Sequence, residues 1–255
     1  MKPEDKNRVY NALLITMSFL LICWALFLLD AELGYNIKSW GLKPRKSEGL
    51  IGILSVHFLH KDYEHIINNS WAFLVLNLYL FFFYRGVAYK VFPIILIVSA
   101  ILLWIWGRPG NHIGASVVVY GLSSFLFFSG LFRKSLPLMA VSALVLFSYG
   151  SMLWGVFPIR PEMSWEGHLS GALVGLLCAY YYREDGPQRK VYQWELDEER
   201  ERLVFENTTY EEIGMEEAEA FMRLQEENPI HHSHNSNEDP VRINYSYQEQ
   251  KKKDQ

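Results

Sequence analysis

Ser116 and His168 are a serine and a histidine, residue types that act together as nucleophile and base. Each is next to a run of apolar residues in the sequence. Ser116 follows the polar, flexible stretch GNHIGA and opens the apolar run SVVVYGL, so we expect it at the start of a helix. A serine hydroxyl is a poor nucleophile until a base removes its proton, and histidine is the usual base because its pKa lies near neutrality. If the fold brings the two side chains together, the chemistry that they favour is acyl transfer.

Six apolar blocks of the chain must position these residues. The chain has 255 residues and is half hydrophobic, and blocks of about 18 or more apolar residues are typical of membrane-spanning helices. The sequence therefore predicts an all-α, polytopic membrane protein with a bundle of six transmembrane helices. The predicted spans are residues 9–29, 64–84, 91–106, 115–132, 136–157 and 167–182.

The charges divide the chain into two parts. Residues 1–183 carry 15 Lys+Arg and 9 Asp+Glu, whereas residues 184–255 carry 9 and 19. We expect a membrane domain over 1–183 and an acidic tail over 184–255, partly helical in 191–227 and disordered in 228–255. Basic residues flank the spans mainly on one side, which predicts cytoplasmic N and C termini in a multi-pass protein of the plasma (inner) membrane.

This topology places three polar residues at one depth in the bilayer. Spans two, four and six run in the same direction, and each ends at an arginine on its inner side. One polar residue lies 15 to 17 residues before that arginine in each span: Asn69, Ser116 and His168. At about 1.5 Å per residue, all three lie roughly 22–26 Å from the inner surface. Polar residues inside a membrane are costly unless they are paired or hydrated, so this convergence favours a reactive site over three separate packing residues.

Other groups at this depth suit the same chemistry. Attack on an amide forms an oxyanion, which requires fixed hydrogen-bond donors. His65 and Asn69 are four residues apart and share a helix face, and the backbone N–H of Ser116 is free at a helix start. Tyr120, one turn after Ser116, can hold an imidazole by stacking. No acidic residue is well placed to orient His168, so the sequence predicts a Ser–His dyad and not a triad.

Glycines of the sixth span explain how the two catalytic candidates meet. They recur at residues 167, 171 and 175, which makes a face of small side chains. We expect this face to press the sixth span against the fourth near Gly121, and so to bring His168 to Ser116.

Three motifs resemble those of the rhomboid family of intramembrane serine proteases. HKDYEHIINN, residues 60–69, resembles the His-rich motif at the start of the family's second span. GASVVVYGL, residues 114–122, resembles the Gly-x-Ser-Gly motif that opens the fourth span. GHLSGALVG, residues 167–175, resembles the His-x-x-Gly-x-x-x-Gly run of the sixth. The resemblance covers about residues 50–183.

The resemblance implies an activity and a set of site residues. It implies a serine endopeptidase, a hydrolase that cleaves peptide bonds in or near transmembrane segments of membrane proteins. Ser116 is then the nucleophile and His168 the general base. The other implied site residues are the oxyanion-hole pair His65 and Asn69 and the supporting residues Tyr120, Gly114 and Gly171.

The sequence departs from the family pattern at two places, and the first of them keeps an alternative open. Val117 stands where the family usually has a glycine, and a valine there narrows the site or shifts the Ser116 amide. The Trp-Arg pair common in the family's first loop is absent. The alternative is a catalytically impaired rhomboid-like protein that binds membrane clients. A small transporter or channel is disfavoured, because the spans lack deep charged residues and paired broken helices.

We expect no cofactor and no metal site. Cys23 and Cys178 lie inside predicted spans and suggest neither a disulfide nor a metal site. The expected partners are the lipid bilayer and transmembrane protein substrates, with no nucleic acid, because the basic residues are topological markers. The loop 156–166, which directly precedes His168, is expected to act as a cap that moves to admit substrate. The sequence does not predict the oligomeric state or the identity of the substrate.

Overall fold

The computed structural model describes residues 3–159, 162–189, 193–211 and 222–223. The chain forms two compact units, Met1–Lys190 and Val191–Gln255. All regular secondary structure in the described residues is helical, apart from one isolated bridge between Leu42 and His112. The predicted all-α class is therefore confirmed.

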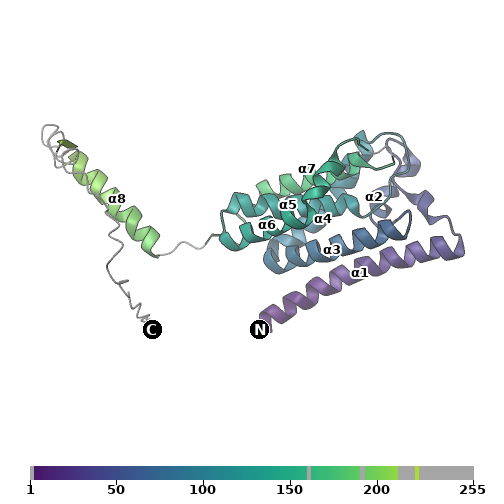
Figure 1. The fold of residues 1–255 in the computed structure, drawn as a ribbon, viewed down its shortest axis with the longest axis horizontal. Helices are drawn as coiled ribbons and strands as arrows, with labels where there is room; N and C mark the ends of the chain where they lie inside the picture. The colour runs from purple at the N-terminus through teal and green to yellow at the C-terminus, as the bar shows by residue number, and fades with distance from the viewer. Residues whose placement is uncertain (1–2, 160–161, 190–192, 212–221, 224–255) are drawn as a thin grey trace, which may run out of the picture. The chain divides into compact units, whose positions relative to one another are not determined.

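Six long helices of the first unit correspond to the six predicted spans (Figure 1). They are α1 (Pro3–Leu33), α3 (Tyr63–Phe83), α4 (Arg85–Trp106), α5 (Ser116–Arg133), α6 (Leu136–Tyr149) and α7 (Trp165–Tyr181). The short turns between them are η1 (Ile37–Trp40), η2 (Ser47–Gly49), α2 (Gly52–Ser55) and η3 (Gly150–Val156).

The second unit contains helix α8 (Gln193–Glu211), which falls inside the segment predicted to be partly helical. The predicted disorder of 228–255 concerns residues outside the described part of the chain. The histidine cluster HHSH at 231–234 also lies outside it.

Four helices of the described chain are long and apolar enough to cross a membrane. They are Val9–Leu33, Tyr63–Phe83, Arg85–Trp106 and Ser116–Arg133. Helix α6 has 14 residues and α7 has 17, so both are short for a bilayer. The first unit is thus an integral membrane domain, and the count of six spans remains a prediction.

Helix α1 extends beyond the predicted span 9–29 at both ends, and two further helix boundaries differ from those predicted. Helix α4 begins at Arg85, six residues before the predicted span. Helix α6 ends at Tyr149, and the chain continues as the 3-10 helix η3 to Val156, where we had predicted one span to residue 157. Gly150 and Gly155 explain the second difference, because glycine weakens an α-helix by about 1 kcal/mol relative to alanine.

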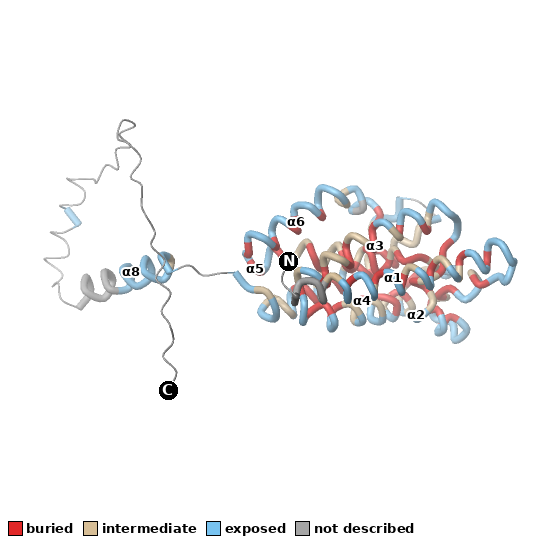
Figure 2. The backbone as a smooth tube through the Cα atoms, turned by 90° about the horizontal axis from the view of Figure 1, so that it is seen from below, coloured by how far each residue is buried: buried red, intermediate tan, exposed pale blue. Residues whose placement is uncertain are grey.

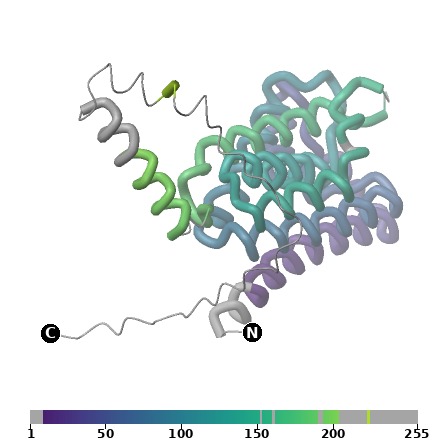
Figure 3. The backbone as a smooth tube through the Cα atoms, turned by 60° about the vertical axis from the view of Figure 1, so that its left-hand side comes forward, coloured from purple at the N-terminus to yellow at the C-terminus, as the bar shows by residue number. Residues whose placement is uncertain are grey.

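Helix α5 lies at the centre of the first unit. It packs against α3, α4, α6 and α7, whereas α1 packs mainly on α3 at the periphery. Figure 3 shows the purple α1 along the outside of the teal and green helices, and Figure 2 shows the buried stretches gathered in the middle of the bundle. Most residues of α5 are buried, whereas Leu131 and Phe132 near its end are exposed.

Glycines allow α5 and α7 to approach closely. A Cβ atom added to Gly171 would lie 2.0 Å from the carbonyl oxygen of Val117, and one added to Gly175 would lie 2.1 Å from that of Gly121. No larger residue fits these two positions without moving a helix backbone. The small face predicted on the sixth span is therefore the surface on which α7 meets α5.

Arg133 fixes the opposite end of α5 to the chain that follows α7. Its guanidinium donates to the carbonyl oxygens of Tyr182, Asp185 (2.5 Å) and Pro187 (3.2 Å). Its Nε also donates to Ser129 Oγ at 2.9 Å. Arg133 thereby ties the end of α5 to the backbone of the segment that directly follows α7. Contacts at both ends hold α5 and α7 in register.

Replacing Gly171 by alanine tests the close approach of α5 and α7. The added methyl group meets a backbone oxygen, so we expect a loss of about 2 kcal/mol of stability, as for other overpacked cores. The measurement is the melting temperature of the protein in detergent. Gly86→Ala is the matched control, because a Cβ at Gly86 meets nothing within 4 Å. Equal melting temperatures for Gly171→Ala and the wild type would contradict the packing described.

Candidate active site

Ser116 and His168 are in hydrogen-bond contact. Ser116 is the first residue of α5, and His168 lies in the first turn of α7. The distance from Ser116 Oγ to His168 Nε2 is 2.9 Å. His168 is only 7% exposed and Ser116 is half-buried. The α5–α7 contact therefore brings together the two residues that the sequence singled out.

The backbone carbonyl of Gly155 orients the imidazole of His168. Nδ1 of His168 lies 2.9 Å from the Gly155 oxygen. A carbonyl oxygen can only accept, so the neutral ring carries its hydrogen on Nδ1 and presents the lone pair of Nε2 to Ser116. This is the tautomer that a general base requires.

Tyr120 packs on the face of the same imidazole. The two ring centroids are 4.1 Å apart and the planes differ by 6°. Tyr120 lies on α5 one turn after Ser116, so the helix that carries the hydroxyl also fixes the plane of the base. The stacking expected from the sequence is present.

His65 lies beside Ser116 at the start of α3. A Cβ at Gly114 would come within 2.8 Å of both Cε1 and Nε2 of His65, and within 3.4 Å of Ser116 Oγ. Gly114 also has φ +131°, a conformation that favours glycine. His65 Nδ1 accepts a long hydrogen bond, 3.5 Å, from the Lys61 amide. In the neutral ring the hydrogen is therefore on Nε2 of His65, and this N–H donor lies on the side of Gly114.

Asn69 provides a buried donor without a partner. It lies one turn after His65 on α3 and is 8% exposed. In the described part of the chain its Nδ2 has no hydrogen-bond partner. Buried amide groups are normally paired, so this nitrogen is suited to an oxygen atom that arrives with a ligand. The Ser116 amide, in the first turn of α5, lacks a helical acceptor for the same geometric reason as other helix N-termini.

Two residues that hold this arrangement are not among those predicted from the sequence. One is Gly155, whose contribution is a backbone carbonyl and leaves no signal in the residue type. The other is His60, which is 2% exposed. Its Nδ1 donates to Phe58 O at 3.3 Å, and its Nε2 accepts from the Ala115 amide at 3.4 Å. His60 thus holds the backbone one residue before Ser116.

A polar network ties the loop before α5 to the start of α7. His112 Nε2 donates to Arg108 O at 2.9 Å, so its Nδ1 accepts from Ser164 Oγ at 2.6 Å. Arg108 Nε pairs with the buried Glu166 at 2.9 Å. Glu166 therefore points toward Arg108, and the group that orients His168 Nδ1 is the Gly155 carbonyl. In the described residues no group of three or more His, Cys, Asp or Glu is arranged to hold a metal.

Val117 points its side chain into an apolar cluster. It is 2% exposed and packs with residues of the first loop and of α4. The buried members of that cluster are Leu42, Val56, Ala100, Leu103 and Val117. Its methyl groups therefore fill the core beside Ser116.

Protonation of His60 should destabilise the protein. Burial lowers the pKa of His60 to about 3, and the neighbouring His65 adds to the effect. The unfolded chain binds this proton near pH 6.5, so the stability due to neutral His60 is complete above pH 6.5 and is lost as the pH falls toward 3.

His60→Gln tests this expectation, since an amide oxygen can still accept from Ala115. Between pH 7 and 5 the variant should lose about 2 kcal/mol less stability than the wild type. Thermal unfolding across this pH range measures it. Parallel pH profiles would show that His60 is not the buried neutral group described.

Val117→Gly should destabilise the protein without improving the site. Removing the buried side chain costs about 2 kcal/mol, and glycine in a helix costs about 1 kcal/mol more. The melting temperature of Val117→Ala should lie between those of Val117→Gly and the wild type. The opposite result would be a Val117→Gly variant that is as stable as the wild type and reacts faster with a serine-directed probe. That result would show that Val117 obstructs Ser116.

Comparison with known proteins agrees with this geometry. Residues 47–185 match the family described as the rhomboid domain. Uncharacterized protein Rv1337 of Mycobacterium tuberculosis and uncharacterized protein Mb1372 of Mycobacterium bovis are each 31% identical to this chain over 185 residues. That alignment covers 68% of this chain and 75% of the relative. Uncharacterized protein ML1171 of Mycobacterium leprae is 29% identical over 184 residues, which cover 68% and 72%.

The match spans the helices that carry Ser116, His168, His65 and Asn69. This chain is a member of the rhomboid family.

Proposed function

We propose that the protein is an intramembrane serine endopeptidase, which cleaves peptide bonds in or near transmembrane segments of other membrane proteins. The observation that carries this proposal is the 2.9 Å contact between Ser116 Oγ and His168 Nε2, with the opposite nitrogen of His168 held by a carbonyl. Family membership supports it, because rhomboids are generally proteases of this kind.

Each step of peptide hydrolysis has a group to perform it. His168 Nε2 takes the proton of Ser116 while Oγ attacks the substrate carbonyl carbon. The oxyanion formed accepts hydrogen bonds from His65, Asn69 and the Ser116 amide. The imidazolium then protonates the leaving amine. Water, deprotonated by the same imidazole, releases the acyl group and restores Ser116.

The proposed topology has six spans and cytoplasmic termini. In it the dyad lies a short way below the outer surface, at the ends of α5 and α7, where His112 of the loop before α5 contacts Ser164. The segment 156–166, of which residues 160–161 lie outside the described part of the chain, is proposed as a cap that covers the site and moves to admit substrate. A substrate helix must unwind locally at the site, because its amide bonds are otherwise hidden.

The alternative of a client-binding protein without activity is less well supported. Its basis was Val117, and the side chain of Val117 packs in the core. The tautomer of His168 suits a working base, which a binding protein has no need to maintain.

Reconstitution with a transmembrane reporter tests the proposal. Wild-type protein in liposomes should cut a reporter whose span contains small or helix-breaking residues near its outer end. Ser116→Ala and His168→Ala should each lower the cleavage rate by at least about 10³-fold. The readout is the mass of the product, which also locates the bond cut.

Ser123→Ala is the matched control. Ser123 lies on α5 two turns from Ser116, and its buried Oγ has no hydrogen-bond partner in the described chain, so its loss should leave cleavage unchanged. Cleavage by Ser116→Ala at the wild-type rate would overturn the proposed function, as would a folded wild type that cuts none of a panel of such reporters.

A further inference from the structure

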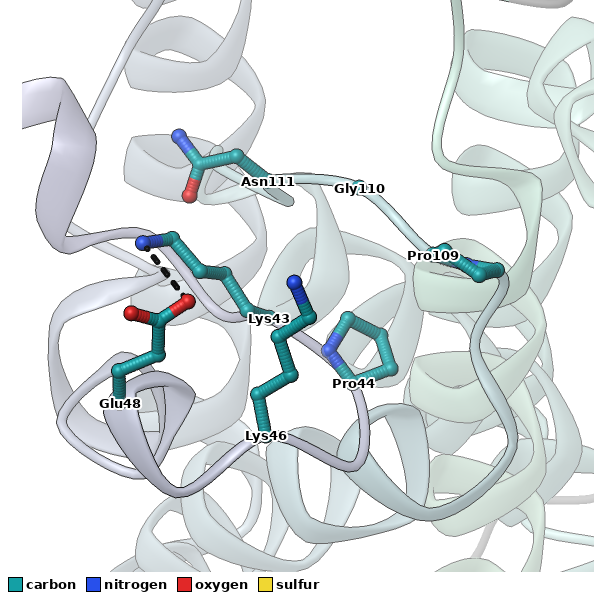
Figure 4. A pocket seen from close by; sticks show the side chains of 7 residues that line it. All are labelled: Lys43, Pro44, Lys46, Glu48, Pro109, Gly110 and Asn111. Atoms are coloured by element: carbon teal, nitrogen blue, oxygen red, sulfur yellow. Dashed lines mark ion pairs between the residues drawn. The ribbon is translucent and has the colours of Figure 1, made fainter.

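A polar pocket of about 270 Å³ lies between the loop that follows α1 and the loop that follows α4 (Figure 4). The ammonium group of Lys46 points toward the second loop, and that of Lys43 lies beside Glu48 of the first loop. The pocket is lined by Lys43, Pro44, Lys46, Glu48, Pro109, Gly110 and Asn111. None of these residues belongs to the site around Ser116.

The pocket has an excess of positive charge. Lys43 forms an ion pair of 3.5 Å with Glu48, whose side chain is 61% exposed. Among the described residues Lys46 has no acidic partner. Asn111 is held at the rim, because its Nδ2 donates to the Lys38 carbonyl at 2.7 Å. One ammonium group is thus uncompensated, and the other is held only by an exposed carboxylate.

The loop that carries the lysines is attached to the end of a candidate membrane span. Trp104 Nε1 donates to the Lys46 carbonyl at 3.1 Å, and the Arg45 guanidinium donates to the Ile105 carbonyl at 3.1 Å. Trp104 and Ile105 are in the last turn of α4, which is long and apolar enough to cross a bilayer. The two lysines therefore lie where a membrane helix ends, which is the level of lipid headgroups.

The segment that carries the lysines also exposes large apolar side chains a few residues away along the chain. Each of them is half or more exposed, at 50–62%. They are Trp40, Leu50, Ile51 and Leu54. Exposed apolar residues beside basic ones are typical of segments that lie in the membrane interface, so acyl chains and headgroups are the neighbours that this surface fits.

We propose that this pocket binds the phosphate group of a phospholipid. The ammonium groups of Lys43 and Lys46 donate to the phosphate oxygens, and the apolar side chains of the loop contact the acyl chains. Lysine side chains at the membrane surface attract anionic lipid headgroups. Glu48 competes with the phosphate for Lys43. The proposal does not depend on the proposed proteolysis, since it concerns binding alone.

Lipid titration of the full-length protein tests the proposal. The protein is held in a neutral detergent, and bound phosphatidylglycerol is counted by native mass spectrometry. Lys46→Gln should weaken the first binding event about fivefold, and Lys43→Gln/Lys46→Gln by about the square of that factor. Glu48→Gln should strengthen binding, because it releases Lys43. Melting temperatures of all variants should stay near the wild-type value, since Lys46 and Glu48 are exposed and the half-buried Lys43 pairs only with the exposed Glu48.

Lys61→Gln is the control for loss of one positive charge from the same end of the molecule, and it should leave lipid binding unchanged. Equal weakening by Lys61→Gln and Lys46→Gln would overturn the proposal in favour of general surface charge. Displacement of the lipid by millimolar inorganic phosphate would overturn it in favour of a free-anion site. Unchanged binding by the double variant would remove the pocket as a lipid site.

Discussion

The backbone-to-backbone contact of α5 with α7 is the constraint on which the candidate site depends. Side chains larger than hydrogen at Gly171 or Gly175 would collide with carbonyl oxygens of α5. In a bilayer, where lipid tails are as apolar as leucine, such close packing is a main source of helix association. It also positions the candidate site, because the hydrogen bond between Ser116 and His168 joins the first turns of the same two helices. The close packing of α5 on α7 that stabilises the bundle is therefore also what the proposed function requires.

The orientation of His168 rests on groups outside its own helix. The carbonyl of Gly155 in η3 holds Nδ1, and the ring of Tyr120 on α5 holds the plane. His112 and Ser164 tie the adjoining loop to the start of α7. The Gly155 carbonyl stands where a catalytic triad has an acidic side chain. It fixes the tautomer of His168 without placing a negative charge beside the imidazole. That arrangement suits a site in a membrane, where each unpaired charge is expensive.

Much of this arrangement could be predicted from the sequence, because helix geometry is regular. A constant rise per residue placed Ser116 and His168 at one depth, and a spacing of four placed Tyr120 over the imidazole. Backbone contributions could not be predicted in this way. The carbonyl of Gly155 carries no residue-type signal, and it lies in a 3-10 turn where the apolar pattern had indicated a continuous helix. The direction of Val117 depends on a cluster built from three distant segments, which one sequence does not reveal.

The reactivity of Ser116 is the most direct test of this account. Purified wild-type protein and His168→Ala would be treated with a fluorophosphonate, and the modified peptide identified by mass spectrometry. The account predicts an adduct on Ser116 of the wild type, formed at least about 10²-fold more slowly when His168 is absent. An adduct on another serine, or equal labelling of Ser116 in both proteins, would contradict the claim that His168 activates Ser116.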